Sequence, residues 1–234
     1  MKKIIFIAIA TVMSLCACHK IQSHDDSKVT YYLDMELVGE SFYAFPVNTA
    51  WTDPKCKVYE NGVDISDKQV VTGTVDLTKP GYYPLMYSAT NADGFPSVCY
   101  REVVVYDPSV TDDISGDYTT QAGTQRIYNA ETTDFAGVSP ITITKVYPGV
   151  FNVSCLIGGF YDVFRGYGQE YQMSGLIQID QSDHSVKLIN SYCEGFGDSL
   201  DTISNGTYDT TSGLISYNAL YVGTMLFTIK LKKN

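Results

Sequence analysis

The segment spanning residues 156–171 contains the residue types most suited to binding a ligand in this 234-residue chain. It places three tyrosines, two phenylalanines, one arginine and one aspartate among four glycines. Glycine lets the backbone turn sharply, so that neighbouring rings can be exposed. Flat tyrosine faces stack on sugar C–H bonds, while aspartate, arginine and glutamine hydrogen-bond to hydroxyl groups. The pattern indicates a glycan-binding loop with these candidate residues: Tyr161, Asp162, Arg165, Tyr167 and Tyr171.

The same segment also fits a structural role. In that interpretation it is a glycine-rich crossover whose rings cover the end of a β-barrel, with its aspartate and arginine as an ion pair. A second stretch of similar composition, residues 191–198, supplies the candidate Tyr192 and would lie beside the first if Cys155 and Cys193 were bridged. Trp51, the only tryptophan, is expected in the core of a β-sandwich, with an exposed binding platform as the alternative.

Histidine is scarce, and this bears on catalysis. The three histidines are His19, His24 and His184. No Ser-His-Asp or Cys-His set can be assembled unless His184 enters it, and a zinc site with several imidazoles is not expected. The acidic loops lack the alternating ligand spacing of an EF-hand calcium site. We therefore expect no catalytic residues, no metal and no cofactor, with a paired-carboxylate glycoside hydrolase as a remote alternative.

The N-terminus has the organisation of an export signal. Two lysines precede an apolar stretch over residues 4–13 that is too short to span a bilayer as a helix. The sequence Leu15-Cys16-Ala17-Cys18 follows, and it resembles the lipobox of bacterial lipoproteins. That resemblance implies cleavage before Cys18 and acyl chains, palmitate among them, that fix this cysteine to a membrane. An ordinary secretory signal with a chance cysteine is the alternative.

The net charge excludes two classes of partner. Cleavage before residue 18 would remove two lysines and leave 14 basic against 26 acidic residues, a net charge of −12. A chain this acidic, without a basic cluster, has no electrostatic footprint for nucleic acid or for anionic lipid headgroups. The lipid on Cys18 is therefore expected to hold the protein at the membrane by itself.

Four cysteines remain beyond the lipobox: Cys56, Cys99, Cys155 and Cys193. They are too far apart in the sequence for a C-x-x-C metal or redox motif. Because export leads to a compartment that permits disulfides, the obvious bridges are Cys56–Cys99 and Cys155–Cys193, each closing a loop of about 40 residues. Free buried thiols are the alternative.

Composition and turn signals predict an all-β fold. Runs of β-branched and aromatic residues alternate with glycine, asparagine, aspartate and proline, and no window keeps a helical apolar period. The expected organisation is a signal peptide (1–17), a tether (18–28), a β-sandwich (29–108), a linker (109–113) and a C-terminal antiparallel β-barrel or sandwich of about eight strands (114–234). Strands of this last part are expected at residues 139–147, 150–155, 171–180, 185–191, 206–209, 214–222 and 225–232.

Ordered motifs in the first half resemble a known family. Taken in order, they look like the bacterial immunoglobulin-like (Ig-like) module of cell-surface and secreted proteins, a type also found in pesticidal crystal proteins. The motifs are residues 61–66, 73–83, 87–94 and 101–105. The whole layout resembles lipoproteins of gut Bacteroidota in which this module precedes an uncharacterised β domain. The resemblance implies the fold but no activity.

Together these observations predict a lipid-anchored protein of the cell envelope, at the outer membrane. The Ig-like module is expected to act as a spacer, and the second domain to carry recognition, with glycan as the favoured ligand. The main alternative is a structural or protein-interaction subunit, or an adhesin, of an outer-membrane complex, with an envelope protein as its partner. No nucleic-acid partner is expected.

Overall fold

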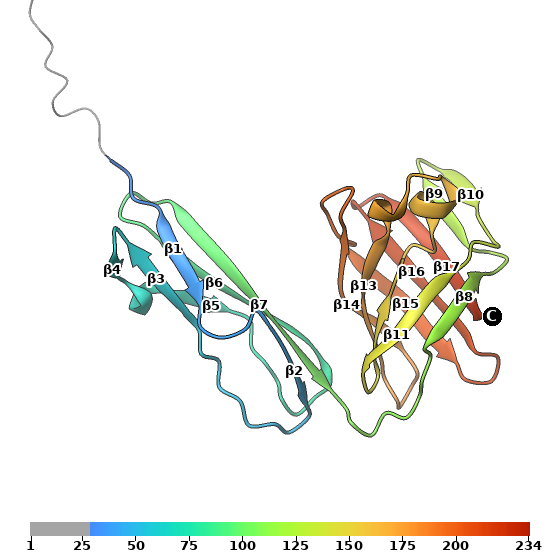
Figure 1. Ribbon diagram of the computed structural model, residues 1–234, viewed down its shortest axis with the longest axis horizontal. Helices are drawn as coiled ribbons and strands as arrows, with labels where there is room; N and C mark the ends of the chain where they lie inside the picture. Colours follow the sequence, from blue (N-terminus) through green and yellow to red (C-terminus); the bar gives the residue numbers. More distant parts are fainter. Residues whose placement is uncertain (1–28) are drawn as a thin grey trace, which may run out of the picture.

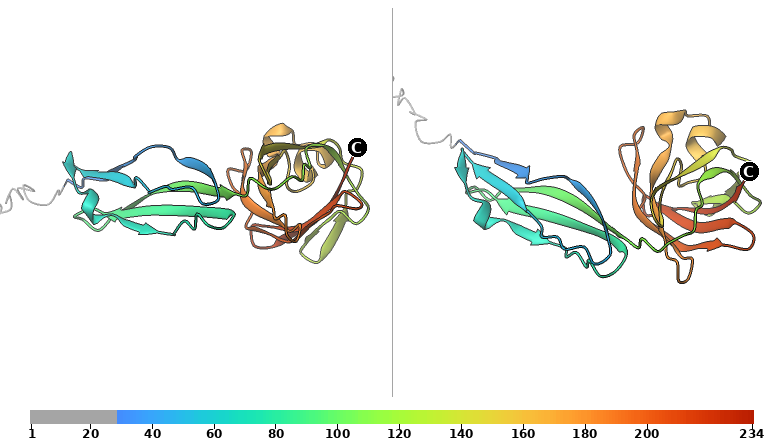
Figure 2. Two further views of the ribbon diagram at one scale, coloured as in Figure 1. Left: turned by 90° about the horizontal axis from the view of Figure 1, so that it is seen from below. Right: turned by 60° about the horizontal axis from the view of Figure 1, so that its bottom comes forward.

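The computed structural model describes residues 29–234, which form two β-sheet bodies arranged end to end (Figures 1 and 2). The predicted signal peptide, the predicted lipid attachment at Cys18 and the predicted tether lie outside these residues. Strands make up nearly all of the regular structure, which confirms the prediction of an all-β chain. Within residues 29–234, no helix is long and apolar enough to cross a membrane.

The first body is a sandwich of two sheets, as the Ig-like resemblance implies. One sheet has the order β1 (Leu33–Leu37), β3 (Cys56–Glu60), β4 (Val63–Asp64), and the short turn η1 (Ser66–Lys68) follows β4. The other sheet has the order β2 (Phe42–Pro46), β7 (Pro96–Tyr106), β6 (Gly81–Thr90), β5 (Val70–Thr72). Strands β2 and β7 run parallel, while the remaining neighbours are antiparallel.

Local sequence explains the elements of this sandwich. In β6, Leu85, Tyr87 and Ala89 are buried, because alternate side chains of a strand point to the same face. The turn between β3 and β4 is made by Asn61 and Gly62, with φ values of 49° and 76°. A two-residue hairpin turn requires positive φ at both central positions, which asparagine and glycine adopt more readily than other residues.

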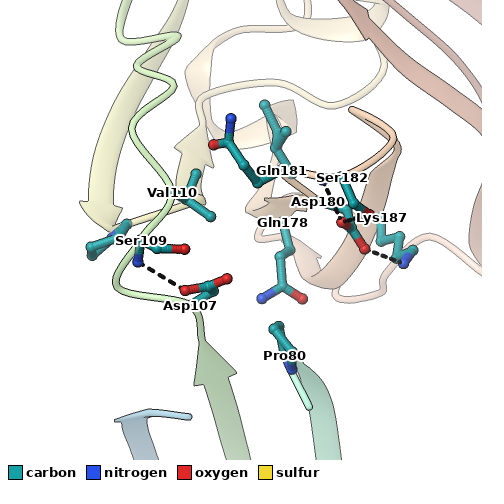
Figure 3. A pocket seen from close by; sticks show the side chains of 11 residues that line it. Pro80, Asp107, Ser109, Val110, Gln178, Asp180, Gln181, Ser182 and Lys187 are labelled. Carbon is teal, nitrogen blue, oxygen red and sulfur yellow. Dashed lines mark hydrogen bonds and ion pairs between the residues drawn. The ribbon is translucent and has the colours of Figure 1, made fainter.

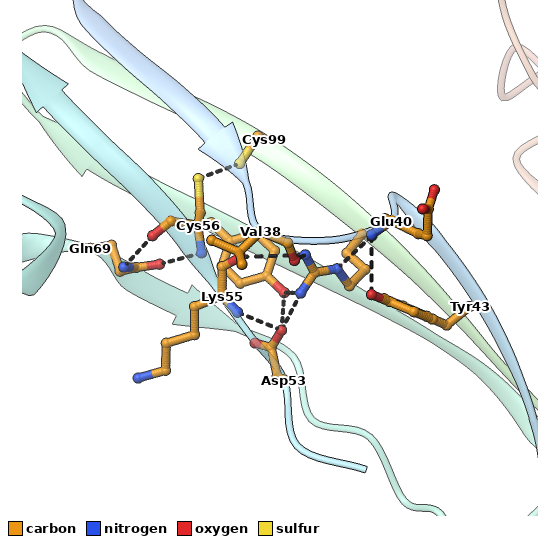
Figure 4. A network of polar contacts seen from close by, with 10 residues as sticks. Val38, Glu40, Tyr43, Asp53, Lys55, Cys56, Gln69 and Cys99 are labelled. Atoms are coloured by element: carbon orange, nitrogen blue, oxygen red, sulfur yellow. Dashed lines mark hydrogen bonds and ion pairs between the residues drawn. The ribbon is translucent and has the colours of Figure 1, made fainter.

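A buried arginine ties the loops of the first body to its sheets. Arg101, on β7, has no exposed surface. Its guanidinium donates to the carbonyl oxygens of Val38 at 2.7 Å and Glu40 at 3.0 Å, and it pairs with the carboxylate of Asp53 (Figure 4). The Tyr87 hydroxyl accepts from Arg101 at 3.1 Å and donates to Asp53 at 2.7 Å. The network therefore links the loop residues Val38, Glu40 and Asp53 to β6 and β7.

The second body is a curled, ten-stranded antiparallel sheet. Its strands are β8 (Gly116–Thr120), β9 (Gln125–Tyr128), β10 (Glu131–Asp134), β11 (Ile141–Tyr147), β12 (Val150–Val153), β13 (Met173–Ile179), β14 (Val186–Cys193), β15 (Thr202–Asp209), β16 (Leu214–Tyr221) and β17 (Met225–Lys233). They follow the order β10-β9-β17-β8-β11-β12-β13-β14, and β16 joins β15 to β17. The sheet curls into a half-barrel, in which an isolated bridge between Ser185 and Thr207 brings β14 to β15.

One large apolar core fills the concave side of this sheet. Strand β16 shows how the sequence directs side chains into it, because Ile215, Tyr217, Ala219 and Tyr221 are buried and the residues between them are not. Two helical turns, η2 (Phe160–Phe164) and η3 (Gln169–Tyr171), lie at one end of the curled sheet (Figure 1). They interrupt the chain between β12 and β13. Together with the loop that joins them, they carry five of the seven candidate ligand-binding residues: Tyr161, Asp162, Arg165, Tyr167 and Tyr171.

The two bodies pack against each other through an apolar cluster in which Val104 of the first body and Val150 and Ile189 of the second are buried. The rings of Tyr106 and Tyr147 are stacked with centroids 5.1 Å apart, and the Gln178 side chain donates to the Val105 carbonyl at 3.1 Å. A cavity of about 410 Å³ lies beside this contact (Figure 3). Residues of both bodies line it, among them Pro80, Asp107, Gln178 and Lys187.

Turn aspartates make stability depend on pH. Six aspartates in or beside turns have a carboxylate that accepts hydrogen bonds from nearby backbone N–H groups or from serine and threonine hydroxyls, and these bonds lower its pKa below the usual value. The residues are Asp64, Asp76, Asp113, Asp180, Asp183 and Asp209. The carboxylate of Asp180, for example, accepts from the Ser182 hydroxyl at 2.6 Å and from its N–H at 3.0 Å.

We expect the protein to lose stability as the pH falls below about 4. A pKa that is lower in the folded than in the unfolded chain contributes stability above the unfolded pKa, and this contribution is lost as the pH falls through the folded pKa. Urea midpoints measured between pH 6 and pH 3 check the slope. The variant Asp180→Asn, which keeps an acceptor oxygen but does not titrate, should show a shallower loss. A midpoint that stays constant over this range would contradict the assignment.

Candidate ligand-binding site

The backbone before η2 turns the chain into the end of the curled sheet. Gly158 and Gly159 have φ values of 65° and 75°, in the left-handed region that glycine favours. A Cβ at Gly159 would lie 2.6 Å from Cγ1 of Val138, so the close approach also requires glycine. Phe160 follows and is fully buried, with its centroid 5.0 Å from that of Phe135. This part of the segment therefore acts as a cover for the core, as the structural interpretation of the sequence expects.

Beyond Phe160, aromatic rings continue from the core to the surface. We call Tyr161, Tyr167, Tyr171, Phe196 and Tyr221 the ring cluster. Tyr161 stacks on Tyr167 with centroids 5.7 Å apart, and the Tyr171 and Phe196 centroids are 4.9 Å apart. Tyr161 is buried, whereas Tyr167 is 53% exposed and Phe196 39% exposed. The outer members of the cluster thus present ring surface to solvent on a rigid, packed base.

A polar hollow lies next to the ring cluster. Its volume is about 590 Å³, and its lining consists of Gln169, Glu170, Gln172, Ser174, Tyr192 and Glu194. The Tyr192 ring is 55% exposed, so one wall of the hollow is aromatic. The other walls supply amide, hydroxyl and carboxylate groups, which donate and accept hydrogen bonds.

The two candidate stretches, residues 156–171 and 191–198, meet at this hollow. Ser174 on β13 pairs with Tyr192 on β14, and the Gly195 N–H donates to the Glu170 carbonyl at 2.7 Å. Strand pairing and this loop contact bring the stretches together without a bridge between Cys155 and Cys193. Cys155 instead lies with its sulfur 3.7 Å from Oδ1 of Asp162.

Asp162 and Arg165 occupy different environments. Asp162 is buried, and its Oδ2 atom has no hydrogen-bond partner among the described residues. Arg165 is exposed, with its guanidinium 5.4 Å from the centroid of the Phe160 ring. The two side chains therefore do not form the ion pair considered from the sequence, and only Arg165 is open to a ligand from outside.

The structure adds residues that the sequence reading did not select. Tyr221 donates to both carboxylate oxygens of Asp198, at 2.9 and 2.8 Å, and burial together with this carboxylate raises the pKa of Tyr221. The Arg126 guanidinium lies 4.8 Å from the centroid of Phe160. Burial raises the pKa of Tyr161, and its hydroxyl donates to the Met225 sulfur at 3.2 Å. The alternation of apolar and polar residues along β16 could have predicted that Tyr221 faces the core. No local pattern in the sequence predicts that Arg126 lies at this site.

Trp51 stands apart from the other candidates. It lies in the first body, half-buried, with its ring centroid 5.5 Å from that of Tyr43 and 5.4 Å from that of Phe45. It also lines a shallow hollow of about 340 Å³ with Asp53 and Leu85 among the neighbours. Its place beside the core of the sandwich matches the default expectation, and it does not join the ring cluster.

The described residues 29–234 show no assembled site for metal binding or for catalysis by histidine. Among residues 29–234, no group of three or more His, Cys, Asp or Glu side chains is placed to hold a metal ion. His184 has its Nδ1 atom 3.1 Å from Oδ2 of Asp112, near the start of the second body and away from η2 and η3. The arrangement at the ring cluster suits recognition of a molecule with apolar faces and many hydroxyl groups.

Two family models match the chain. A model described as a bacterial surface protein, Ig-like domain, matches residues 35–105, and a model for a C-terminal domain matches residues 107–233. No curated protein matches the chain.

Solved structures provide a further comparison. The crystal structure of the lipoprotein BT2262 from Bacteroides thetaiotaomicron is 31% identical in sequence, with a TM-score of 0.50, and the match covers 86% of this chain and 100% of that one. A structure of CBM51-2 in complex with GlcNAc and INT domains from Clostridium perfringens ZmpB is 11% identical, with a TM-score of 0.28, and the match covers 86% of this chain and 43% of that one. A likeness as low as the second carries no argument about this chain.

Proposed function

The chain belongs to the family of the lipoprotein BT2262, and from this premise we propose that it is an envelope lipoprotein that binds glycans through its second body. In this proposal, Cys18 carries the lipid, residues 18–28 form the tether and the Ig-like body acts as a spacer. The second body then stands away from the outer membrane with its ring cluster available to a ligand. Membership of the lipoprotein family supports the lipid anchor on Cys18. The geometry of the second body supports a glycan as the ligand.

The observation that carries the glycan proposal is the position of exposed rings beside the polar hollow. Tyr192, in the lining of the hollow, and Tyr167, two residues before Gln169 of that lining, offer flat apolar faces on which the C–H face of a sugar ring can lie. Gln169, Gln172 and Ser174 offer donors and acceptors for hydroxyl groups at the same place. A volume of about 590 Å³ lies within the range of small-ligand sites.

Replacing either exposed ring should weaken glycan binding. A glycan array with the soluble fragment lacking residues 1–28 identifies the ligand, and calorimetry then measures its affinity for the variants Tyr167→Ala and Tyr192→Ala. We expect each variant to lose about tenfold in affinity, because a stacking contact contributes about 1 kcal/mol or slightly more. Both rings are more than half exposed, so the urea midpoint of each variant should stay unchanged.

The matched control is Tyr100→Ala, on β7 of the first body, where the ring is 58% exposed and far from the hollow. It should bind like the unchanged fragment. An array without any retained glycan, or two ring variants with full affinity, would remove the basis of the proposal.

A protein partner is the second candidate function, and one observation favours it. Val163 and Phe164 of η2 are 48% and 43% exposed, next to the exposed Tyr167. Apolar side chains gathered at one surface are typical of sites that bind another protein. If the array is negative, Phe164→Ser should reduce retention of an outer-membrane protein complex on the immobilised fragment, and Tyr100→Ala should not.

Hydrolysis of the ligand is the remote alternative. Glu170 and Glu194 line the same hollow, and a pair of carboxylates is what most glycoside hydrolases use. Prolonged incubation of a retained glycan with the fragment, followed by chromatography, distinguishes the cases. Binding without turnover leaves the glycan intact; shorter products that disappear with Glu170→Gln would establish an enzyme instead.

A further inference from the structure

Two cysteines of the first body face each other across its two sheets. Cys56 begins β3 in one sheet, and Cys99 lies in the middle of β7 in the other. Their sulfur atoms are 3.2 Å apart (Figure 4). A disulfide bond is about 2.0 Å long, so the sulfurs need to approach by little more than 1 Å.

The backbone around Cys56 is already fixed in position. The Gln69 side chain accepts from the Cys56 N–H at 3.2 Å and donates to the Cys56 carbonyl at 2.8 Å. On its other side, Cys56 pairs with Leu37 of β1. Cys99 is held between its partner Tyr87 on β6 and the rest of β7. Because both strands are held in this way, the two sulfurs meet in the folded protein and have no comparable proximity in the unfolded chain.

The other pair of cysteines does not share this geometry. The Cys155 sulfur lies 3.7 Å from Oδ1 of Asp162, and the Cys193 thiol is directed to the Glu170 carbonyl at 3.8 Å. Both residues are buried. No contact between their two sulfurs occurs among the described residues, so the second bridge considered from the sequence lacks the support that the first one has.

We infer that Cys56 and Cys99 form a disulfide that joins the two sheets of the first body. The inference rests on the envelope location in the proposed function, since that location supplies an oxidant, and it is independent of any glycan. Cys193 and Cys155 remain thiols.

The chemistry requires an oxidised disulfide, from a thiol oxidoreductase or a small molecule, as the electron acceptor. Cys99 is the more exposed of the two sulfurs and is the group that such an acceptor can reach. Its thiolate attacks one sulfur of the acceptor, which forms a mixed disulfide and releases the other sulfur as a thiol. The Cys56 sulfur then loses its proton, attacks Cys99 and releases the second thiol. The protein loses two hydrogens, and the acceptor is reduced to two thiols.

Burial raises the pKa of Cys56 to about 12, so the second step is slow at neutral pH while the bond, once formed, is shielded from reductants. The reaction should consequently be accelerated at higher pH.

Thiol counting tests the inference directly. The fragment lacking residues 1–28 retains four cysteines, and it is incubated with oxidised glutathione, denatured and alkylated. Mass spectrometry should find two alkylated thiols, at Cys155 and Cys193, and one crosslinked peptide pair containing Cys56 and Cys99. The urea midpoint followed by Trp51 fluorescence should be higher before reduction than after it, because Trp51 is in the crosslinked body.

Two variants serve as controls. Cys99→Ser should abolish both the crosslink and the difference between oxidised and reduced midpoints, and the double variant Cys155→Ser/Cys193→Ser should keep both. Four alkylated thiols in the oxidised fragment, or a crosslink that includes Cys155 or Cys193, would overturn the inference. Because no glycan takes part, these outcomes are independent of the array result.

Discussion

Replacing Arg101 with methionine is expected to lower the free energy of unfolding of the first body by about 3–5 kcal/mol. The side chain is fully buried, and methionine fills a similar volume without donating hydrogen bonds. Asp53 would then be left with a carboxylate that lacks its cation, and the carbonyls of Val38 and Glu40 would lose their donor. Removing one partner of such a pair is costly because the Asp53 carboxylate, whose side chain is only 20% exposed, would keep its charge without the cation that compensates for its partial desolvation.

Trp51 makes the effect measurable in the intact two-body protein. It is the only tryptophan and lies in the same body as Arg101, so its fluorescence reports unfolding of this body alone. Urea titration should give a much lower midpoint for Arg101→Met. The matched control is Lys79→Met, which breaks the exposed pair between Lys79 and Asp76, 3.6 Å apart, and should leave the midpoint unchanged. Equal midpoints for the two variants would contradict the role assigned to the buried network.

Replacing Phe160 with alanine is expected to destabilise the second body by about 3–5 kcal/mol, the usual effect of removing a large aromatic side chain from a core. Phe160 is fully buried, with centroid distances of 5.0 Å to Phe135 and 5.5 Å to Phe227. The Arg126 guanidinium would also lose the ring face on which it lies. Because η2 begins at Phe160, the same change should displace Tyr161 and Tyr167 and weaken ligand binding under conditions where the body is still folded.

The stability measurement for Phe160→Ala must report on the second body alone. Hydrogen exchange followed by mass spectrometry does so, because peptides from β11, β12 and β17 belong to the second core. Exchange in these peptides should accelerate strongly in Phe160→Ala, while peptides from β6 and β7 stay protected. The neighbouring Phe164→Ala, whose ring is 43% exposed, is the control and should exchange nearly as the unchanged protein does. Uniform acceleration in both bodies would show that the effect is not local.

Alternation made the long strands of the second body predictable. Strands expected at 214–222 and 225–232 correspond to β16 (Leu214–Tyr221) and β17 (Met225–Lys233). The hairpin of β9 and β10 was not foreseen, because its strands are polar and only half-buried or exposed. Its turn uses Asn129 and Ala130 with φ values of 51° and 63°, and alanine rarely signals a turn with positive φ.

The candidate site was predictable in composition but not in orientation. The sequence placed the two ring-rich stretches together only on the condition of a bridge between Cys155 and Cys193, whereas the pairing of β13 with β14 brings them together without one. The sequence did not predict that Tyr161 is buried and Tyr167 exposed, because side chains outside regular strands and helices do not alternate between core and solvent with a fixed period. Arg101 was equally hidden: its partner Asp53 is 48 residues away, and a charged residue in a strand normally indicates exposure.

The parallel pairing of β2 with β7 determines how the first body responds to a pulling force. The chain enters this body at the end near β1 and leaves it at the opposite end through β7 (Figure 1). Tension between the two ends therefore slides β2 and β7 past each other along their length, in shear. The five residue pairs from Phe42–Glu102 to Pro46–Tyr106 must then break together rather than one after another. A body with this geometry resists extension by flow or by a bound particle far better than one whose strands can be unzipped.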